Sequence, residues 1–464
     1  MGFQNLSSQR IRFIIIGLML SSLLSAVDST IVGTAMPKVV NDLQGMNHYT
    51  WPFTAYMLTS TISIPIFGKL ADLFGRKPIY FIGVITFILS SALCGAANNM
   101  LQLILFRGLQ GIGGGVLISG SMQIVGELFP VKERGKYMGI ISSVFGFASL
   151  MGPTVGGVIA DNFSWRWIFY INLPLGILAM IIMFWALPYQ RSHQHRKIDY
   201  AGGLALIFAL VPLLLAFLWA GKDYAWRSAP IISLLVVAGI MIGTFIILEG
   251  KAVEPVVPLS MFKNSIFLVS VLAAFLSSIL LFTVVIYVPL FVQGVLGANA
   301  TSSGVIITPM NISQVVTGII TGQIIAKTGK YKGLAVFGFV VTTAGIGYLS
   351  GLGPGTSDFQ MVILLILLGL GAGTIMPALS ISVQNVFPQD QIGVVSAGLQ
   401  FFRNLGGTLG TAVLGTVMAA GVKNGLAYAI QHVFLLGFFV GAGGIAVIFF
   451  LKEIELNNKM EFIE

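Results

Sequence analysis

The sequence predicts an all-α polytopic membrane protein that crosses the bilayer fourteen times. Hydrophobic residues make up 56% of the 464-residue chain and charged residues only 9%, whereas a soluble globular domain carries roughly 25% charged residues. The chain contains uninterrupted apolar runs such as residues 79–93, while strands of transmembrane barrels alternate in polarity over about 10 residues. These observations exclude both a water-soluble globule and a transmembrane barrel.

The spans are defined by hydropathy, because about 20 apolar residues cross the hydrocarbon core of a bilayer. The first run is too long for the core of a cleaved signal peptide, so we expect it to be retained as a helix. The predicted helices lie at 12–36, 51–70, 79–97, 101–125, 137–160, 166–187, 200–220, 228–248, 266–292, 302–326, 334–352, 359–383, 393–421 and 428–451.

The basic residues predict that both termini lie in the cytosol. With this orientation most of the 25 Lys and Arg residues fall in cytosolic loops or at the termini, as the positive-inside rule requires. The residues that fall outside are Lys38, Arg166, Lys222, Arg227 and Lys423. The net charge of +9 therefore reports membrane orientation, and we expect no nucleic-acid partner because there is no folded domain with a basic face.

An internal repeat predicts two related halves. "GKLADLFGRKP" at 68 resembles "GQIIAKTGKYK" at 322, and "GIGGG" at 111 resembles "GLGAG" at 369. These offsets skip two helices, so the predicted order is 6 + 2 + 6. We expect an N-terminal six-helix bundle at 1–190, an inserted helix pair with flanking cytosolic segments at 191–264, and a C-terminal six-helix bundle with a short tail at 265–464. Such parallel halves occur in one class of secondary transporters.

Asp28 is the acidic residue that lies clearly inside a predicted span. An ionisable group in hydrocarbon costs at least a few kcal/mol, so it is a functional candidate by default. Helix rise places Asp28 and Arg107 at similar depths, roughly 12 and 9 Å below the outer surface. Burial and a neighbouring arginine shift the proton affinity of a carboxyl in opposite directions, so such a pair can exchange a proton. A permanent ion pair that only joins the first and fourth helices is the alternative.

Arg403 is the other basic residue inside a span, roughly 15 Å from the inner surface. Gln400 and Asn404 share its helical face. This face lines a cavity or holds another helix, and the sequence does not separate these two roles. Aromatic and amide side chains that could supply further cavity contacts, each with helix packing as its alternative, are Tyr56, Tyr287, Asn311 and Gln314.

The sequence carries no pattern of an enzyme. "GKLADLFGRKP" lacks the residue order of a phosphate-binding loop, and "GIGGG" follows no strand, so we expect no nucleotide to bind. The single cysteine, Cys94, lies in an apolar run, and the four histidines do not form a ligand set. We therefore expect no catalytic residue, no metal and no cofactor.

Over essentially its whole length the chain resembles the major facilitator superfamily. "GKLADLFGRKP" is similar to the motif between helices 2 and 3, "RGLQGIGGG" to the helix 4 motif, and "GPTVGG" to the helix 5 motif of drug antiporters. "LSAVDSTIVGTAMP", which contains Asp28, resembles the helix 1 motif of the fourteen-helix drug/proton antiporter branch, the quaternary-ammonium-resistance type of multidrug exporter. "WRWIFYINLPLG" and "FRNLGGTLGTAVLG" also look like this branch.

The resemblance implies the major facilitator fold and a proton-coupled secondary antiporter that exports amphipathic drugs by alternating access. Asp28 and Arg107 would then couple protons to substrate. Residues implied for the cytosolic gate are Gly68, Asp72, Gly75, Arg76 and Arg134, with Arg134 as the partner of Asp72. Those of the helix 5 antiporter motif, for which a bend and close helix packing are expected, are Gly152, Pro153, Gly156 and Gly157.

One departure from the branch bears on the substrate. Family members that export dicationic compounds often carry further acids in the second half, whereas the last six predicted helices contain none. A neutral, zwitterionic or weakly anionic amphiphile is therefore the expected cargo. We expect a monomer in a bacterial-type plasma membrane, with the lipid bilayer, protons and a small molecule as partners.

Other functions remain open from the sequence. A dedicated exporter or importer of a single metabolite would have the same fold, and differs in the breadth of its substrates and the direction of their movement. A channel would conduct without saturable exchange, and a membrane enzyme would convert its substrate.

Overall fold

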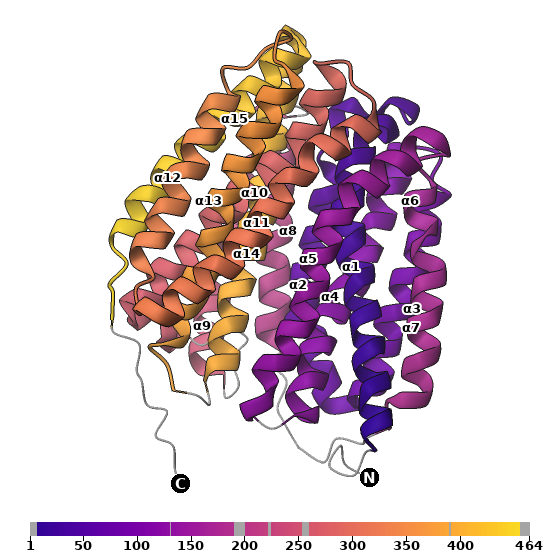
Figure 1. Cartoon of the computed structure of the whole chain (residues 1–464), viewed down its shortest axis with the longest axis vertical. Coiled ribbons are helices and arrows are strands. Elements are labelled where there is room, and N and C mark those ends of the chain that lie inside the picture. Colours follow the sequence, from indigo (N-terminus) through magenta and orange to yellow (C-terminus); the bar gives the residue numbers. More distant parts are fainter. Residues whose placement is uncertain are drawn as a thin grey trace. The chain divides into compact units, whose positions relative to one another are not determined.

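The computed structural model describes residues 7–129, 131–189, 200–220, 224–252, 259–388 and 391–454, and Figure 1 shows that long helices dominate this part of the chain. In chain order the helices are α1 (Ser8–Asp42), α2 (Trp51–Phe74), α3 (Arg76–Gly95), α4 (Met100–Leu128), α5 (Val131–Asn162), α6 (Trp167–Tyr170), α7 (Asn172–Ala186), α8 (Tyr200–Trp219), α9 (Ala229–Lys251), α10 (Ser265–Gly294), α11 (Ala300–Thr328), α12 (Lys332–Leu349), α13 (Asp358–Gln384), α14 (Ile392–Gly421) and α15 (Leu426–Phe449).

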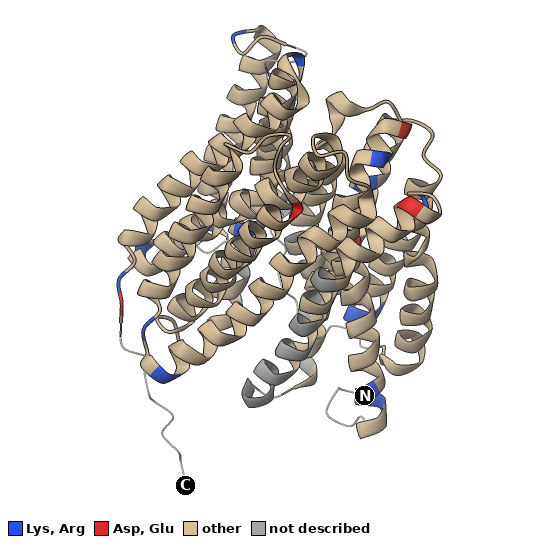
Figure 2. Ribbon diagram, turned by 45° about the horizontal axis from the view of Figure 1, so that its top comes forward, with Lys and Arg blue, Asp and Glu red and all other residues tan. Residues whose placement is uncertain are grey.

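These helices match the predicted spans one for one when α6 and α7 are taken together, so the prediction of an all-helical chain with fourteen helices is confirmed. Among the described residues, 11 helices are long and apolar enough to cross a membrane, and α8 contributes a shorter apolar stretch, Ala201–Phe217. Figure 2 shows that charged residues gather near the helix ends and are sparse along the helices.

The sixth predicted helix differs from the expectation, because it is interrupted at Ile171. Pro174 has no N–H to donate to the carbonyl four residues before it, and its ring disfavours a continuous helix at this point. The interruption places Asn172 at the first position of α7. This residue belongs to the candidate site.

Helix α1 is longer than hydropathy predicts, because polar contacts support both of its ends. Ser7 accepts a hydrogen bond from the Arg10 backbone N–H at the N-terminal end. At the other end, Asp42 accepts a hydrogen bond of 2.8 Å from Trp165 Nε1. A hydropathy profile does not detect such polar contacts. The predicted span, 12–36, is therefore shorter than α1 at both ends.

The chain divides into two compact units. The first contains Met1–Val256, Val288–Thr308 and Thr411–Ala420. Within it α2 and α3 pack on α4, α1 packs on α5 and α7, and α8 packs on α9. The second contains Val257–Tyr287, Pro309–Gly410 and Gly421–Glu464, and within it α12 packs on α13 and α15.

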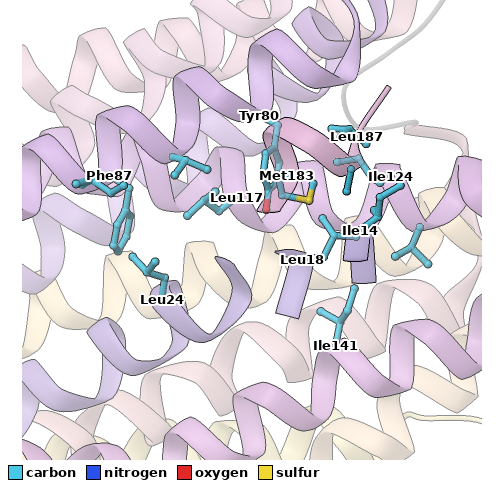
Figure 3. Packing of buried hydrophobic residues seen from close by; sticks show 14 of the residues in the cluster. Ile14, Leu18, Leu24, Tyr80, Phe87, Leu117, Ile124, Ile141, Met183 and Leu187 are labelled. Atoms are coloured by element: carbon cyan, nitrogen blue, oxygen red, sulfur yellow. The ribbon is translucent and has the colours of Figure 1, made fainter. Parts of the chain in front are cut away.

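The core of the first unit is an apolar cluster contributed by α1, α2, α3, α4, α5 and α7. Figure 3 shows Leu18, Tyr80, Leu117 and Met183 among its buried members. Lipid tails are as apolar as these side chains, so the cluster stabilises the unit by close packing and not by removal from water. Gly17 permits one such approach, because a Cβ atom there would lie 2.5 Å from Met183 Sδ.

Candidate functional site

The candidate coupling site is a buried ion pair between α1 and α4. Arg107 Nη1 lies 2.6 Å from Asp28 Oδ2, and the two side chains are 1% and 0% exposed. The structure thus brings together the two charged residues that the sequence places at similar depths. Neither side chain reaches the surface in this conformation.

Two amide side chains complete the shell around the carboxylate. Gln110 Nε2 donates to Asp28 Oδ1 at 2.8 Å, and Asn172 Nδ2 donates to the same oxygen at 3.1 Å. Gln110 Oε1 in turn accepts from Arg107 Nη1 at 2.8 Å. A carboxylate that accepts several hydrogen bonds and faces a guanidinium is stabilised in its charged form.

Asn172 extends this network to α3. Its Nδ2 also donates to Ser91 Oγ at 3.0 Å, and Ser91 Oγ donates to the Phe169 carbonyl at 2.8 Å. In the described part of the chain, neither Asn172 Oδ1 nor Arg107 Nε has a hydrogen-bond partner, although both are buried. Three polar side chains therefore donate to Asp28, while two polar atoms of this shell have no hydrogen-bond partner among the described residues.

Aromatic rings cover the guanidinium of Arg107. Its Cζ lies 4.3 Å from the centroid of the Tyr56 ring and 5.9 Å from that of Phe169. Such cation–π contacts stabilise a cation that has little contact with water. Tyr56, predicted as a cavity residue, thus belongs to the coupling site, and its hydroxyl lies 3.3 Å from Ser25 Oγ.

The glycines after Arg107 allow α2 and α3 to approach α4 closely. A Cβ atom at Gly111 would collide with Thr59 and with the Tyr56 carbonyl, and one at Gly114 with the Tyr56 hydroxyl. Gly113 faces α3, where a Cβ atom would lie 2.6 Å from the Phe87 backbone nitrogen. The glycine-rich stretch therefore serves helix packing, as expected for small residues in membrane helices.

Gln110 and Asn172 were not among the residues selected from the sequence. Gln110 follows Arg107 by three positions and so lies on the same helical face, which is a usable signal. Asn172 is a polar residue inside an apolar span, and the same cost argument that selects Asp28 would have selected it.

The residues implied for the cytosolic gate are described only in part. Gly75 joins α2 to α3 with φ of 94°, a conformation that favours glycine. Arg76 Nη1 donates to Gln123 Oε1 at 2.7 Å, and a Cβ atom at Gly68 would lie 2.8 Å from Gln123 Nε2. The side chains of Asp72 and Arg134 lie outside the described residues. Gln123 on α4 is thus a contact of this segment that the sequence did not indicate.

The helix 5 motif packs on two neighbours within the first unit. A Cβ atom at Gly152 would collide with Thr30, and one at Gly156 would lie 2.7 Å from the Ile31 carbonyl, both on α1. On α11, a Cβ atom at Gly157 would collide with the Ala300 carbonyl. A Cβ atom at Gly304 would likewise collide with the carbonyl of Pro153.

Polar contacts join α5 to the first turns of α11 beside these glycines. Thr154 Oγ1 and Thr308 Oγ1 are 2.7 Å apart. Asp161 Oδ2 accepts hydrogen bonds of 2.6 Å from both the backbone N–H and the hydroxyl of Thr301. Asp161 also forms an ion pair with Lys38 of α1. These contacts and the small residues form a seam, by which we mean the α5–α11 contacts from Pro153 to Asp161.

Contacts at the seam stabilise the ionised form of Asp161, a residue just outside the predicted span 137–160. Burial of the carboxyl acts to raise its pKa, but hydrogen bonds from Lys38 and Thr301 and the charge of Lys38 outweigh this effect and hold the pKa of Asp161 below its ordinary value. The carboxylate therefore stays ionised at neutral pH, as the capping of the α11 N-terminus requires.

A cavity lies inside the second unit. The volume of this cavity that is accessible to the centre of a water molecule is about 30 Å³. Arg403 of α14 lines it together with side chains of α10, α11, α12 and α13, including Ser277, Gln314 and Thr342. Two of the predicted cavity residues, Gln314 and Arg403, thus share one cavity.

The remaining predicted cavity residues lie elsewhere. Gln400 Nε2 donates to Asn404 Oδ1 at 3.0 Å, so these two side chains pair along α14. Tyr287 and Asn311 are buried in the second unit and are not among the residues that line the cavity. Hydropathy gave their depth in the membrane but not the direction of their side chains.

The described helices and their motifs agree with a known family. Residues 18–411 match the model of the Major Facilitator Superfamily. The chain belongs to the Major Facilitator Superfamily. It is 46% identical over 407 residues to the multidrug transporter protein MdtP of Bacillus subtilis (strain 168), covering 88% of this chain and 75% of that protein. It is 37% identical over 409 residues to multidrug resistance protein 3 of the same organism, covering 88% and 79%.

More distant relatives share the fold of this Major Facilitator Superfamily member. The chain is 33% identical over 414 residues to the efflux pump FUS6 of Gibberella moniliformis, covering 88% and 74%. Among solved structures, a bacterial homolog of the human lysosomal transporter Spinster aligns with a TM-score of 0.65 at 16% identity, covering 96% of this chain and 95% of the other. The predicted superfamily is confirmed, and the chain is a multi-pass membrane transporter and not an enzyme.

Proposed function

We propose that this transporter is a proton-coupled antiporter of the fourteen-helix branch that exports amphipathic drugs from a bacterial cell by alternating access. Multidrug transporters among its relatives support drug efflux. Proton coupling rests on one observation, the fully buried Asp28 carboxylate with its guanidinium and amide donors. We further propose a 6 + 2 + 6 arrangement with cytosolic termini, acting as a monomer in the plasma membrane without a cofactor.

Protonation of Asp28 would change the balance of charge inside the first unit. The neutral carboxyl no longer compensates Arg107, and an uncompensated buried charge is strongly destabilising. A rearrangement that brings Arg107 to water or to an acidic group of the substrate relieves this cost. Proton binding is thereby linked to helix movement, which is the requirement for coupling.

The available driving force is sufficient for export. One elementary charge moving across 100 mV supplies about 2.3 kcal/mol, which corresponds to a substrate gradient of roughly fiftyfold if one net charge moves per cycle. In the proposed cycle the seam closes the outer side while the cytosolic side is open. Contacts such as Thr154–Thr308 and Asp161–Thr301 must break when the site opens outward. Gly68, Gly75 and Arg76, with Asp72 and Arg134, would act at the opposite gate.

The decisive experiment is substrate-induced proton release from proteoliposomes under an imposed pH gradient. Addition of cholate, an amphipathic carboxylate, or of its uncharged methyl ester to wild-type vesicles should release protons. Asp28→Asn should abolish this release while the protein remains folded in the membrane. Asp358→Asn is the matched control, because Asp358 is an acidic residue at the first position of α13. Normal substrate accumulation by Asp28→Asn would refute the proposal.

A further inference from the structure

We propose that the cavity around Arg403 is a subsite for the carboxylate, or an equivalent acidic group, of an exported amphiphile. This inference rests on the proposed export function and names a substrate class for it. It concerns a site in the second unit, whereas the coupling residues Asp28 and Arg107 belong to the first.

Arg403 carries a charge without a counter-charge among the described residues. Its guanidinium is permanently protonated, and in the described part of the chain no ion pair or hydrogen bond joins it to another residue. Helices α10, α11, α12, α14 and α15 contain no Asp or Glu, and in α13 the single acid is Asp358 at its first residue. A charged side chain inside a membrane helix is costly, so a retained one has a functional role by default.

The neighbours on α14 do not supply the missing partner. Gln400 and Asn404, which flank Arg403 on the same face, donate and accept between themselves. The cavity offers further donors instead. Thr342 Oγ1 is buried and has no hydrogen-bond partner among the described residues, and the Gln314 side chain also lines the space.

The size of the cavity fits a polar end group and not a whole drug. The volume accessible to the centre of a water molecule is about 30 Å³. One buried water molecule needs about 10–15 Å³, so the cavity accommodates roughly two. A carboxylate is of this size, and its two oxygens match the planar donor fork of a guanidinium. A cationic end group would be repelled by Arg403.

The apolar wall of the cavity suits a variable cargo. Met310 and Met376 line it beside Leu280 and Leu281. Methionine side chains are flexible and polarisable, and they adapt to irregular apolar surfaces. The subsite therefore combines one fixed charge with adaptable packing, which favours acidic amphiphiles of differing shape.

The test measures binding of tritiated cholate and of its uncharged methyl ester to the purified full-length protein in lipid nanodiscs, with empty nanodiscs as the blank. We expect wild type to bind cholate at least about tenfold more tightly than the ester. Arg403→Gln should weaken cholate binding by about 10- to 100-fold, as expected for loss of a charged hydrogen bond, and leave ester binding unchanged. Arg403→Lys should retain part of the preference.

Lys423→Gln is the matched control, because it removes a cation that is exposed and lies outside the cavity. Gln314→Glu is a second test that keeps Arg403 in place. The added carboxylate would pair with the guanidinium of Arg403 in the same cavity, so cholate binding should weaken. Equal affinity of wild type for cholate and the ester would overturn the inference. Unchanged cholate binding by folded Arg403→Gln would overturn it as well.

Failure of this inference is distinguishable from failure of the export proposal, because the binding assay contains no proton gradient. Wild type that releases protons with the uncharged ester but shows no preference for cholate over the ester in binding overturns the subsite alone. Wild type that binds cholate through Arg403 but never exchanges protons overturns the coupling and leaves the subsite standing.

Discussion

Arg107 Nη1 and Asp28 Oδ2 are 2.6 Å apart in a place where neither side chain is more than 1% exposed. An ion pair in such surroundings is weak evidence for stability, because the cost of removing two charges from water offsets their attraction. Loss of either partner would leave the other charge buried and uncompensated, which is strongly destabilising.

Arg107→Gln should destabilise the protein by about 3–5 kcal/mol, because it leaves the Asp28 carboxylate buried without its cation. Adding Asp28→Asn should recover most of this loss, since the double variant has no buried charge in the pair. Thermal unfolding of the purified proteins measures both effects. If the second substitution adds to the first instead of rescuing it, the two charges are not energetically coupled.

Asn172→Ala removes one of the amide donors to Asp28 Oδ1. A carboxylate with fewer donors is less stable in its charged form, so the pH profile of proton-coupled transport should differ from that of wild type. The measurement is the pH profile of transport in proteoliposomes. Asn162→Ala is the control, because Asn162 is exposed and its side chain donates within its own helix. A profile that matches that of wild type would show that Asn172 has only a packing role.

Gly157→Val should prevent closure of the seam, because even a Cβ atom at this position collides with the Ala300 carbonyl. We expect loss of most substrate export and increased exposure of the seam to water, measured as labelling of a cysteine introduced at Thr308. Gly243→Val is the matched control, since no atom lies within 4 Å of a Cβ atom there. Equal labelling of the two variants would contradict the role given to Gly157.

The seam also predicts a pH dependence through Asp161, whose pKa is held below its ordinary value. A carboxyl with a lowered pKa contributes stability that is fully present above its ordinary value and is lost as the pH falls through the lowered one. Asp161→Asn should therefore unfold at a lower temperature than wild type at pH 7, with a loss of roughly 1 kcal/mol or less because Lys38 is partly exposed. The two melting curves should begin to converge below about pH 4 and meet only below the lowered pKa of Asp161. A difference that persists in acid would show that the ionised form of Asp161 is not the stabilising species.

Much of the fold could be predicted from hydropathy, because the bilayer fixes how many apolar residues a span needs. The interruption at Ile171 was missed, since it depends on Pro174 within an otherwise apolar run. Depth along a helix was sufficient to pair Asp28 with Arg107. The direction of a side chain was not available from depth, so Tyr287 and Asn311 were grouped with Gln314 although they do not line its cavity.

Cys94 lies against the coupling residues, with its Sγ 3.5 Å from Gln110 Oε1 and its side chain fully buried. It is the single cysteine of the chain. The native sequence therefore carries one thiol reporter beside the shell of Asp28, and no background cysteines have to be removed. A maleimide added with and without substrate would read out, at this one sulfur, how often the interior of the first unit is exposed to solvent.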